Sequence, residues 1–343
     1  MWALVKWACA TALLLGAGGA VAQDEDAAFQ AYLPQLRAQA IAAGVRPATV
    51  DAVLPTLVID PQVIRNDRAQ PAPVSTNSFT PFAPYRARHV NADRIGRGRR
   101  AYQAQAGRLA AIERRTGVPG SIAAAIWGHE TDYGANTGRY DLLRSLATLA
   151  YEGRRRSLFA GEFVAALKML DRGVPRYRMR GSWAGAFGGP QFLPSVYLRL
   201  ARDGDGDGFA DVWTSDADTI ASIGAYLQDA GWRPGEPWGF AVSVPPSLDR
   251  AALRTRLTAP RCPRVFVRHS GWRSVAEWRA LGVQPQSTGW PADSVQATLL
   301  EPDGAGATAY LLTSNYRAIL DYNCSNFYAL SVGLLADAVA QAS

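Results

Sequence analysis

The most constraining feature of this chain is residues 117–134, which read Gly-Val-Pro-Gly-Ser-Ile-Ala-Ala-Ala-Ile-Trp-Gly-His-Glu-Thr-Asp-Tyr-Gly. The proline suits the first turn of a helix and Gly134 suits a C-terminal cap, so the stretch predicts one helix. Ile122, Ile126 and Glu130 fall on one apolar stripe of that helix. Burial would raise the pKa of Glu130 toward neutrality, as a general acid requires. A salt-bridged structural glutamate is the alternative.

Other catalytic chemistries have little support in the sequence. The His-Glu pair at 129–130 would need a second histidine at position 133 to form a zinc-protease motif, and Tyr133 stands there. The chain has three histidines and no G-x-S-x-G elbow, so a nucleophilic triad is not indicated either. A formal charge of +7 favours anionic partners. No basic motif with interleaved aromatic residues points to nucleic acid, which is not expected as a partner.

The N-terminus predicts export. Lys6 precedes a short apolar run, and Ala20-Val-Ala22 follows as a small-residue cleavage site, so residues 1–22 resemble a signal peptide. The run is shorter than the roughly 20 residues of a membrane span. We therefore expect a soluble periplasmic protein, with lipid anchoring at Cys9 as a weaker alternative. Cys262 and Cys324 remain after cleavage and can pair in an oxidising compartment, or stay as two buried thiols.

Apolar periodicity divides the rest of the chain. Helical spacing occupies 26–63 and 91–115, and short helices alternate with Gly-rich loops between 119 and 232. Strands are predicted by Val-rich runs at 241–244 and 265–267 and by two further apolar runs at 295–300 and 307–312, the last two as a hairpin. The predicted segments are a signal peptide (1–22), a helical domain (23–118), a catalytic core with a calcium loop (119–235), a small β-rich module (236–321) and a C-terminal helix (322–343) that packs back on the helical domain.

An acidic loop at 203–211, Asp-Gly-Asp-Gly-Asp-Gly-Phe-Ala-Asp, matches the first half of a calcium loop. The predicted ligands are Asp203, Asp205, Asp207 and the carbonyl group of Phe209. Thr214 stands where the loop usually ends in glutamate, so Asp216 or Asp218 has to supply the last ligand. An acidic turn without an ion is the alternative, with Asp218 as a helix N-cap.

Residues 181–195 place small residues between aromatic side chains and an amide, as the wall of a sugar-binding cleft would. Phe192 is a candidate for stacking on a sugar ring, and a core aromatic residue is an equal alternative.

Together these motifs resemble the B-type lytic murein transglycosylases, bacterial enzymes of the cell wall. The resemblance covers almost the whole chain after the leader. It rests on Asn66-Asp-Arg-Ala-Gln-Pro71, Ile126-Trp-Gly-His-Glu-Thr-Asp-Tyr-Gly134, Ser145-Leu-Ala-Thr-Leu-Ala-Tyr151, Gly181-Ser-Trp-Ala-Gly-Ala186, Gln191-Phe-Leu-Pro-Ser195, the acidic loop and Asp321-Tyr-Asn323. It implies an α+β, mainly α fold with a lysozyme-like core, a helical domain and a small β-rich module.

The resemblance also implies roles for individual residues. Glu130 would be the single catalytic acid/base, and the acidic loop a structural Ca²⁺ site with no organic cofactor. Substrate would be bound by Ser182, Gln191, Tyr226, Tyr322, Tyr328, Arg155 and Arg156. Two residues depart from the family pattern. Pro190 stands before Gln191 where small or polar residues are more usual, and Asp216 lies close to the end of the calcium loop, so the local geometry at these two places is expected to differ.

The implied activity is cleavage of the β-1,4 bond between N-acetylmuramic acid and N-acetylglucosamine, with formation of 1,6-anhydromuramyl ends. A hydrolytic muramidase, with Asp132 or another acid activating water, and a non-catalytic peptidoglycan-binding protein are the alternatives. The expected partners are glycan strands of peptidoglycan, with proteins of cell-wall synthesis left open, and a monomer is expected.

Overall fold

The structure is a computed structural model that describes residues 16–70, 79–254, 262, 264–286 and 289–341, with side chains from residue 24 onward. The chain forms two compact units. The first takes residues up to Gln70, Gly138–Phe187 and Leu193–Leu198, and the second takes the remainder. These units cut across the predicted segments 23–118 and 119–235, because the chain enters the first unit repeatedly. The five-segment division stays a prediction, and most of the predicted signal peptide (1–15) lies outside the described residues.

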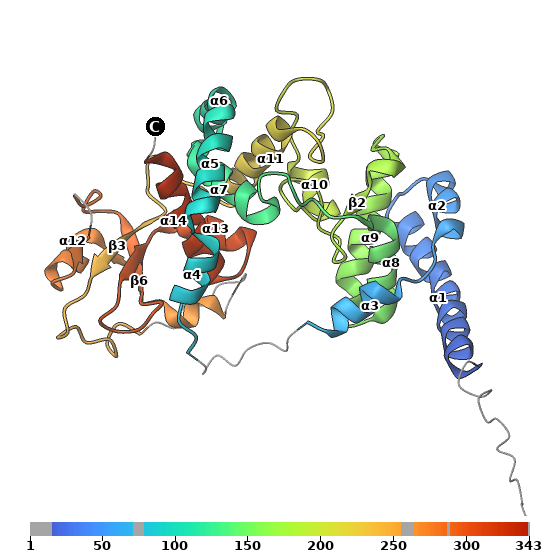
Figure 1. Cartoon of the computed structure of the whole chain (residues 1–343), viewed down its shortest axis with the longest axis horizontal. Coiled ribbons are helices and arrows are strands. Elements are labelled where there is room, and N and C mark those ends of the chain that lie inside the picture. Colours follow the sequence, from blue (N-terminus) through green and yellow to red (C-terminus); the bar gives the residue numbers. More distant parts are fainter. Residues whose placement is uncertain (1–15, 71–78, 255–261, 263, 287–288, 342–343) are drawn as a thin grey trace, which may run out of the picture. The chain divides into compact units, whose positions relative to one another are not determined.

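The first unit is mainly helical. Its elements are α1 (Gly16–Ala42), α2 (Pro47–Val53), the 3-10 turn η1 (Leu54–Thr56), α3 (Pro61–Arg68), β1 (Tyr140–Asp141), α8 (Leu142–Glu152), α9 (Arg156–Asp171), the 3-10 turn η2 (Arg176–Arg178) and β2 (Arg180–Gly181). Helices α8 and α9 pack on each other and α1 packs on both (Figure 1). Phe29, Leu36, Leu146 and Phe163 are fully buried in this unit. The short strands β1 and β2 pair in antiparallel orientation.

The second unit contains a cluster of helices and a small sheet. The helices are α4 (Ala83–His89), α5 (Ala92–Ala104), α6 (Ala106–Thr116), α7 (Gly120–Thr131), α11 (Asp216–Asp229), α12 (Val275–Ala280), α13 (Ser314–Tyr322) and α14 (Asn326–Ala340). Helix α10 (Pro194–Leu200) lies where the chain leaves the first unit for the second.

Helix α7 is the central helix of the second unit. It packs against α5, α6, α11 and α14, and every residue from Ile122 to Gly128 is buried (Figure 1). A helix that is apolar on nearly all faces is stable only when neighbouring helices surround it. The core is therefore built around the helix that carries Glu130.

The sheet is antiparallel with the strand order β4-β6-β7-β3-β5. The strands are β3 (Gly239–Ser243), β4 (Arg273–Ser274), β5 (Gln284–Pro285), β6 (Gln296–Leu300) and β7 (Ala309–Leu312). Alternate residues of β6 and β7 join two different cores. Leu300 and Leu312 belong to the helical core, whereas Leu299 and Leu311 pack with Trp278 under the sheet.

One predicted strand is wrong. Residues 265–267 form part of a 3-10 turn, η3 (Val265–Arg268), and not a strand. The turn buries Phe266 and leaves Val267 exposed, a pattern that a short apolar run does not distinguish from a strand. Cys262 and Cys324 form a disulfide with their Cα atoms 5.2 Å apart. Among the described residues, no helix has both the length and the apolar character of a membrane span.

Candidate active site

Glu130 lies in the last turn of α7. The predicted cap at Gly134 is wrong, because the helix ends at Thr131 and Asp132 follows with a left-handed φ of 55°. The backbone N–H of Asp132 donates to the carbonyl oxygen of Gly128 and closes the last turn. Aspartate adopts this conformation more readily than most residues, so the chain turns two residues earlier than the glycine suggests.

The protein environment shifts the ionisation of Glu130 strongly. Burial raises the pKa of its carboxyl group to about 7, although a hydrogen bond from Tyr328 opposes the shift. The residue as a whole keeps partial exposure, so Glu130 lies at the edge of the core and not deep inside it. A carboxyl group with this pKa is present in both protonation states near neutral pH. It can therefore release a proton and take one back.

Tyr328, in the first turns of α14, is the direct partner of the acid. Its hydroxyl group donates to Oε1 of Glu130 at 2.6 Å. Burial raises the pKa of Tyr328 well above its ordinary value, and the charge of Glu130 raises it further. The tyrosine thus remains a neutral donor. Since Oε1 accepts this hydrogen bond, the proton of the neutral acid resides on Oε2.

His129 adds no positive charge beside the acid. Its ring stacks on that of His89 at 5.6 Å and lies 5.4 Å from the ring of Tyr328. Burial, with the charge of Arg94 next in importance, lowers the pKa of His129 to about 3. The imidazole is therefore neutral at any pH at which the protein would work, and it packs against the ring of Tyr328.

Asp132 is the acid next along the chain from Glu130, and it is already engaged. One of its carboxylate oxygens accepts a hydrogen bond from Nε of Arg97 at 3.0 Å. Arg97 also pairs with Asp93 on its own helix. The ion pair leaves Asp132 poorly placed to act as the base that a hydrolytic mechanism would need.

Three aromatic rings predicted to contact substrate gather in the second unit. The ring centroids of Tyr226 and Tyr322 are 4.6 Å apart, and Phe192 lies 5.8 Å from the first and 6.1 Å from the second. The hydroxyl groups of the two tyrosines both donate to backbone acceptors. Tyr226 donates to the carbonyl oxygen of Asp321 at 2.8 Å, and Tyr322 donates to the carbonyl oxygen of Pro190.

Gln191 lies in a short loop that belongs to the second unit. Its φ of 49° is in the left-handed region, which is uncommon for a residue other than glycine. The side-chain amide group donates to the carbonyl oxygens of Gly188 at 3.0 Å and Thr137 at 3.3 Å. The amide nitrogen is thereby fixed by two backbone acceptors.

Ser182, Arg155 and Arg156 belong to the first unit. Ser182 lies in a tight turn, where its Oγ accepts from the backbone N–H of Ala186 at 3.1 Å. Arg155 donates to buried Asp67 at 3.0 Å. Arg156 donates to the carbonyl oxygen of Tyr151 at 3.2 Å and lies over the ring of Tyr32. Both arginines therefore have structural partners within their own unit.

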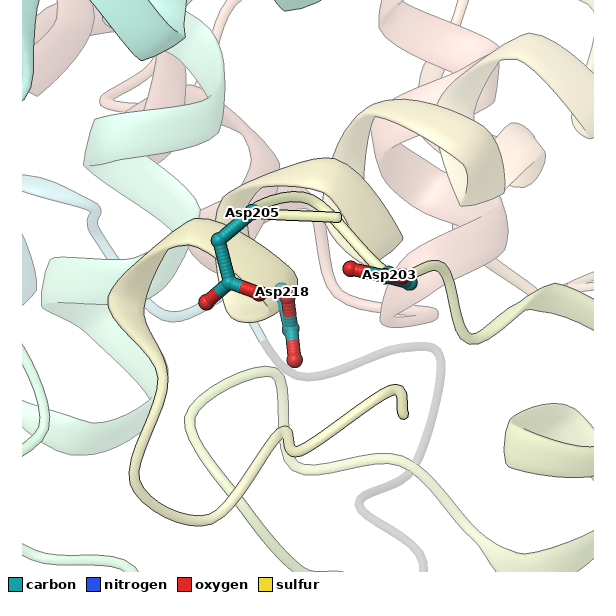
Figure 2. Close-up of side chains that lie close together, drawn as sticks. All are labelled: Asp203, Asp205 and Asp218. Carbon is teal, nitrogen blue, oxygen red and sulfur yellow. The ribbon is translucent and has the colours of Figure 1, made fainter. Parts of the chain in front are cut away.

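The acidic loop gathers three carboxylates. Ligand oxygens of Asp203, Asp205 and Asp218 all lie within 4.8 Å of one another. Figure 2 shows the three side chains pointing toward a common space, with Asp218 coming from α11. Asp216 accepts instead from Gln105, so Asp218 is the residue that extends the loop. Ser215, and not Asp218, is the N-cap of α11.

The electrostatics of this acidic cluster suit a cation. Burial raises the pKa of Asp218, the backbone N–H groups of Gly204 and Asp211 lower it, and the charges of Asp205 and Asp203 raise it again. Oxygen ligands that repel each other at this spacing are typical of a calcium site. Asp207 lies outside this group of three and accepts from the backbone N–H of Phe209.

Sequence analysis missed the contact between Tyr328 and Glu130. The two residues are 198 positions apart, and the resemblance placed Tyr328 among the sugar-binding residues. Only the packing of α14 against α7 reveals the contact. The ring stack of His89 on His129 was also missed, because nothing in the sequence around either residue relates the two.

Solved structures with similar folds come from bacteria. SltB3 from Pseudomonas aeruginosa, in a complex with NAG-anhNAM-pentapeptide, aligns with a TM-score of 0.80 and 38% identity over 91% of this chain and 79% of that one. The lytic transglycosylase Slt35 from Escherichia coli, in complex with calcium, aligns with a TM-score of 0.73 and 26% identity over 90% and 93% of the two chains. The protein therefore has the mainly helical, lysozyme-like fold of these lytic transglycosylases.

The sequence comparisons agree with the fold. The family model described as the transglycosylase SLT domain matches residues 28–337. Membrane-bound lytic murein transglycosylase B from Escherichia coli K12 is 34% identical over 229 residues, which are 66% of this chain and 58% of that relative. The chain belongs to the transglycosylase SLT domain family, and the predicted resemblance is confirmed. Its match spans less than two thirds of the length of the Escherichia coli relative.

Proposed function

We propose that this chain is a peptidoglycan lytic transglycosylase, a carbon-oxygen lyase. It would cleave the β-1,4 bond between N-acetylmuramic acid and N-acetylglucosamine and leave a 1,6-anhydromuramyl end. The observation that carries the proposal is Glu130, a partly exposed residue at the end of α7 whose carboxyl pKa burial raises to about 7. Membership of the transglycosylase family supports it, as does the anhydro sugar in the SltB3 complex.

In the first step Glu130 acts as an acid. Its proton passes from Oε2 to the bridging oxygen, and the bond from that oxygen to C1 of the muramyl sugar breaks. The positive charge that develops at C1 is shared with the ring oxygen. Tyr328 keeps its hydrogen bond to Oε1 and stabilises the carboxylate that this step creates.

In the second step the same group acts as a base. The carboxylate takes the proton of the C6 hydroxyl group of the muramyl sugar, and O6 forms a bond to C1. Glu130 is protonated again and no water is consumed. The substrate supplies its own nucleophile, so a second carboxyl group is not needed, in contrast to ordinary glycosidases. The ion pair of Asp132 with Arg97 fits this account.

Product mass separates this mechanism from hydrolysis. Purified sacculi digested by the protein should release muropeptides with anhydro ends, which are one water lighter than the products of a muramidase. Glu130→Gln keeps the shape of the side chain but removes the acid, and it should abolish release. Full activity of this variant, or products of hydrolytic mass, would refute the proposal.

A non-catalytic wall-binding protein is the remaining alternative. It would bind sacculi stoichiometrically and release nothing as protein concentration rises. Titration of sacculi with wild-type protein, followed by measurement of both bound protein and released sugar, distinguishes the two. Turnover should exceed one product per protein molecule.

For substrate binding, we infer roles for Gln191, Phe192, Tyr226 and Ser182. The amide oxygen of Gln191 is the group that would accept from a sugar hydroxyl group, because the amide nitrogen already donates to two backbone carbonyl oxygens. Phe192 is buried, so it would act by packing behind the loop and not by stacking on a sugar ring. Tyr322 and Tyr328 are also assigned to the proposed site. Tyr322 donates to the carbonyl oxygen of Pro190, next to Gln191, and Tyr328 donates to Glu130. Arg155 and Arg156 would add positive charge, although each has a partner in its own unit.

We further propose that the acidic loop binds one structural Ca²⁺. Carboxylates of Asp203, Asp205 and Asp218 would hold the ion, and the predicted ligands Asp207 and the carbonyl group of Phe209 would complete the shell. The repulsion among the three gathered carboxylates supports the proposal, because a divalent cation would remove it. The ion would fix the loop between α10 and α11 and take no part in the chemistry.

The predicted leader supports export to the periplasm, where the wall substrate is found. Glycan strands are the proposed partner, and proteins of cell-wall synthesis remain open as further partners. A cleaved and freely diffusing form is proposed over a lipid-anchored one.

A further inference from the structure

The loop that carries Gln191 is an unusual part of the second unit. Residues 188–192, here called the Gln191 loop, are preceded and followed in the sequence by segments of the first unit, 138–187 and 193–198. Five residues have no regular element of their own to hold them. Their position depends on what the rest of the second unit provides.

The backbone of the Gln191 loop is hydrogen-bonded shortly before its strained residue. The N–H of Gly189 donates to the carbonyl oxygen of Val212 at 2.7 Å, and the hydroxyl group of Thr131 donates to the carbonyl oxygen of Gly189 at 3.2 Å. A Cβ atom on Gly189 would lie 2.4 Å from Oγ1 of Thr219, so the backbone rests directly on α11. These contacts fix the start of the loop.

Tyr322 holds the next peptide. Its hydroxyl group donates to the carbonyl oxygen of Pro190, which is bonded directly to the nitrogen of Gln191. Burial raises the pKa of Tyr322 well above its ordinary value, and the charges of Glu130 and Tyr226 raise it further, so the hydroxyl group remains a donor. Its ring also packs 6.1 Å from that of Phe192, at the end of the loop.

The peptide that Tyr322 holds sets the strained geometry of Gln191. A left-handed φ at a non-glycine residue persists only where the surroundings over-determine it. The plane of the Pro190–Gln191 peptide fixes that φ, and the direction of the carbonyl group of Pro190 defines the plane. If the peptide could rotate, Gln191 would relax and its side chain would leave the carbonyl oxygens of Thr137 and Gly188.

We propose that Tyr322 is a positioning residue that acts through Gln191: its hydroxyl group fixes the Pro190 peptide and thereby aims the Gln191 side chain at the sugar. This rests on the proposed function for the identity of the sugar. It differs from the role that the family resemblance suggests, in which Tyr322 itself binds substrate. Tyr322 would not touch the reacting atoms.

Hydrogen exchange tests the structural part without any need for activity. Tyr322→Phe removes the hydroxyl group and keeps the ring against Phe192. We expect the backbone amide groups of the Gln191 loop to exchange about fivefold faster, the factor for one hydrogen bond of ordinary net strength. Tyr316→Phe is the matched control on the same helix, because it loses a buried hydroxyl group that donates to Asn326 at 3.0 Å. Unchanged exchange in the loop of the first variant would overturn the proposal.

Kinetics test the functional part. Tyr322→Phe should raise KM for a soluble glycan about fivefold while kcat changes less, and Tyr316→Phe should change neither. Added to Gln191→Ala, the Tyr322→Phe change should cost nothing more, because the group it positions is gone. Additive losses would overturn the proposal. Wild-type protein that releases no product would refute the proposed function, whereas the exchange result would still decide the role of Tyr322.

Discussion

The hydrogen bond between Tyr328 and Glu130 predicts a specific change in pH dependence. The proposed reaction begins with protonated Glu130, so the rate should fall on the alkaline side as the acid ionises with a pKa of about 7. The hydroxyl group of Tyr328 stabilises the ionised form and lowers that pKa. Removing it in Tyr328→Phe should therefore raise the pKa of Glu130 and move the alkaline limb to higher pH.

The size of the shift follows from the strength of the bond. A hydrogen bond to a charged group contributes about 1.5–3 kcal/mol, and one pKa unit corresponds to about 1.4 kcal/mol. The 2.6 Å length places this bond among the strong ones. The limb should thus move upward by about one to two units, while the maximal rate falls because the carboxylate formed in the first step has lost a donor.

The measurement is the pH profile of kcat/KM for release of anhydro muropeptides from purified sacculi. Tyr316→Phe is the control, since its hydroxyl group donates to Asn326 and not to the acid. Its profile should match that of the wild type. A limb that stays in place in Tyr328→Phe, or that moves to lower pH, would refute the assignment of Tyr328 as the group that tunes Glu130.

Three further predictions concern stability. Folding raises the pKa of Glu130 from 4.5 to about 7, so the free energy of unfolding should fall as pH rises from about 4.5 to 7 and stay low above that. Glu130→Gln should therefore raise the free energy of unfolding by about 3 kcal/mol at pH 8 and hardly at pH 4, measured by urea denaturation. Folding lowers the pKa of His269 from 6.5 to about 4, so protonation of the unfolded state favours unfolding as pH falls. Between pH 7 and pH 4 the free energy of unfolding should therefore fall by about 3 kcal/mol more in the wild type than in His269→Gln. A smaller difference would mean that this histidine is not held neutral. Ca²⁺ at about 100 times its Kd should stabilise the protein by about 2.7 kcal/mol. Asp218→Asn should remove most of this gain and Asp216→Asn little, as read from the shift in Tm; equal effects would contradict the ligand assignment.

Sequence patterning predicted the parts of the site that depend on one local element. The apolar spacing around Ile122 and Ile126 identified the helix of Glu130, because a core helix must present its side chains at that period. The alternation of aspartate and glycine at 203–208 likewise identified the acidic loop. In both cases the residues that matter lie within a few turns of one another.

The remaining features depend on long-range packing, which periodicity does not encode. Asp218 and Asp216 are equivalent in the sequence, and only the start of α11 directs one toward the loop and the other toward Gln105. The early helix end at Asp132 was hidden by a better glycine signal two residues later. The Gln191 loop could not be assigned to the second unit, since both of its neighbours in the chain belong to the first.

The single-acid mechanism places two opposite demands on Glu130, and the structure shows how they are balanced. Cleavage needs the carboxyl group protonated, whereas ring closure needs it ionised moments later. Burial alone would keep the carboxyl group protonated, but it would also make the group a weaker acid that is reluctant to release its proton in the first step. The Tyr328 hydrogen bond favours the carboxylate, and the two effects together leave the pKa at about 7. A group whose pKa lies near the working pH pays the smallest free-energy cost both for donating a proton and for accepting one. This is the condition for one carboxyl group to perform both steps.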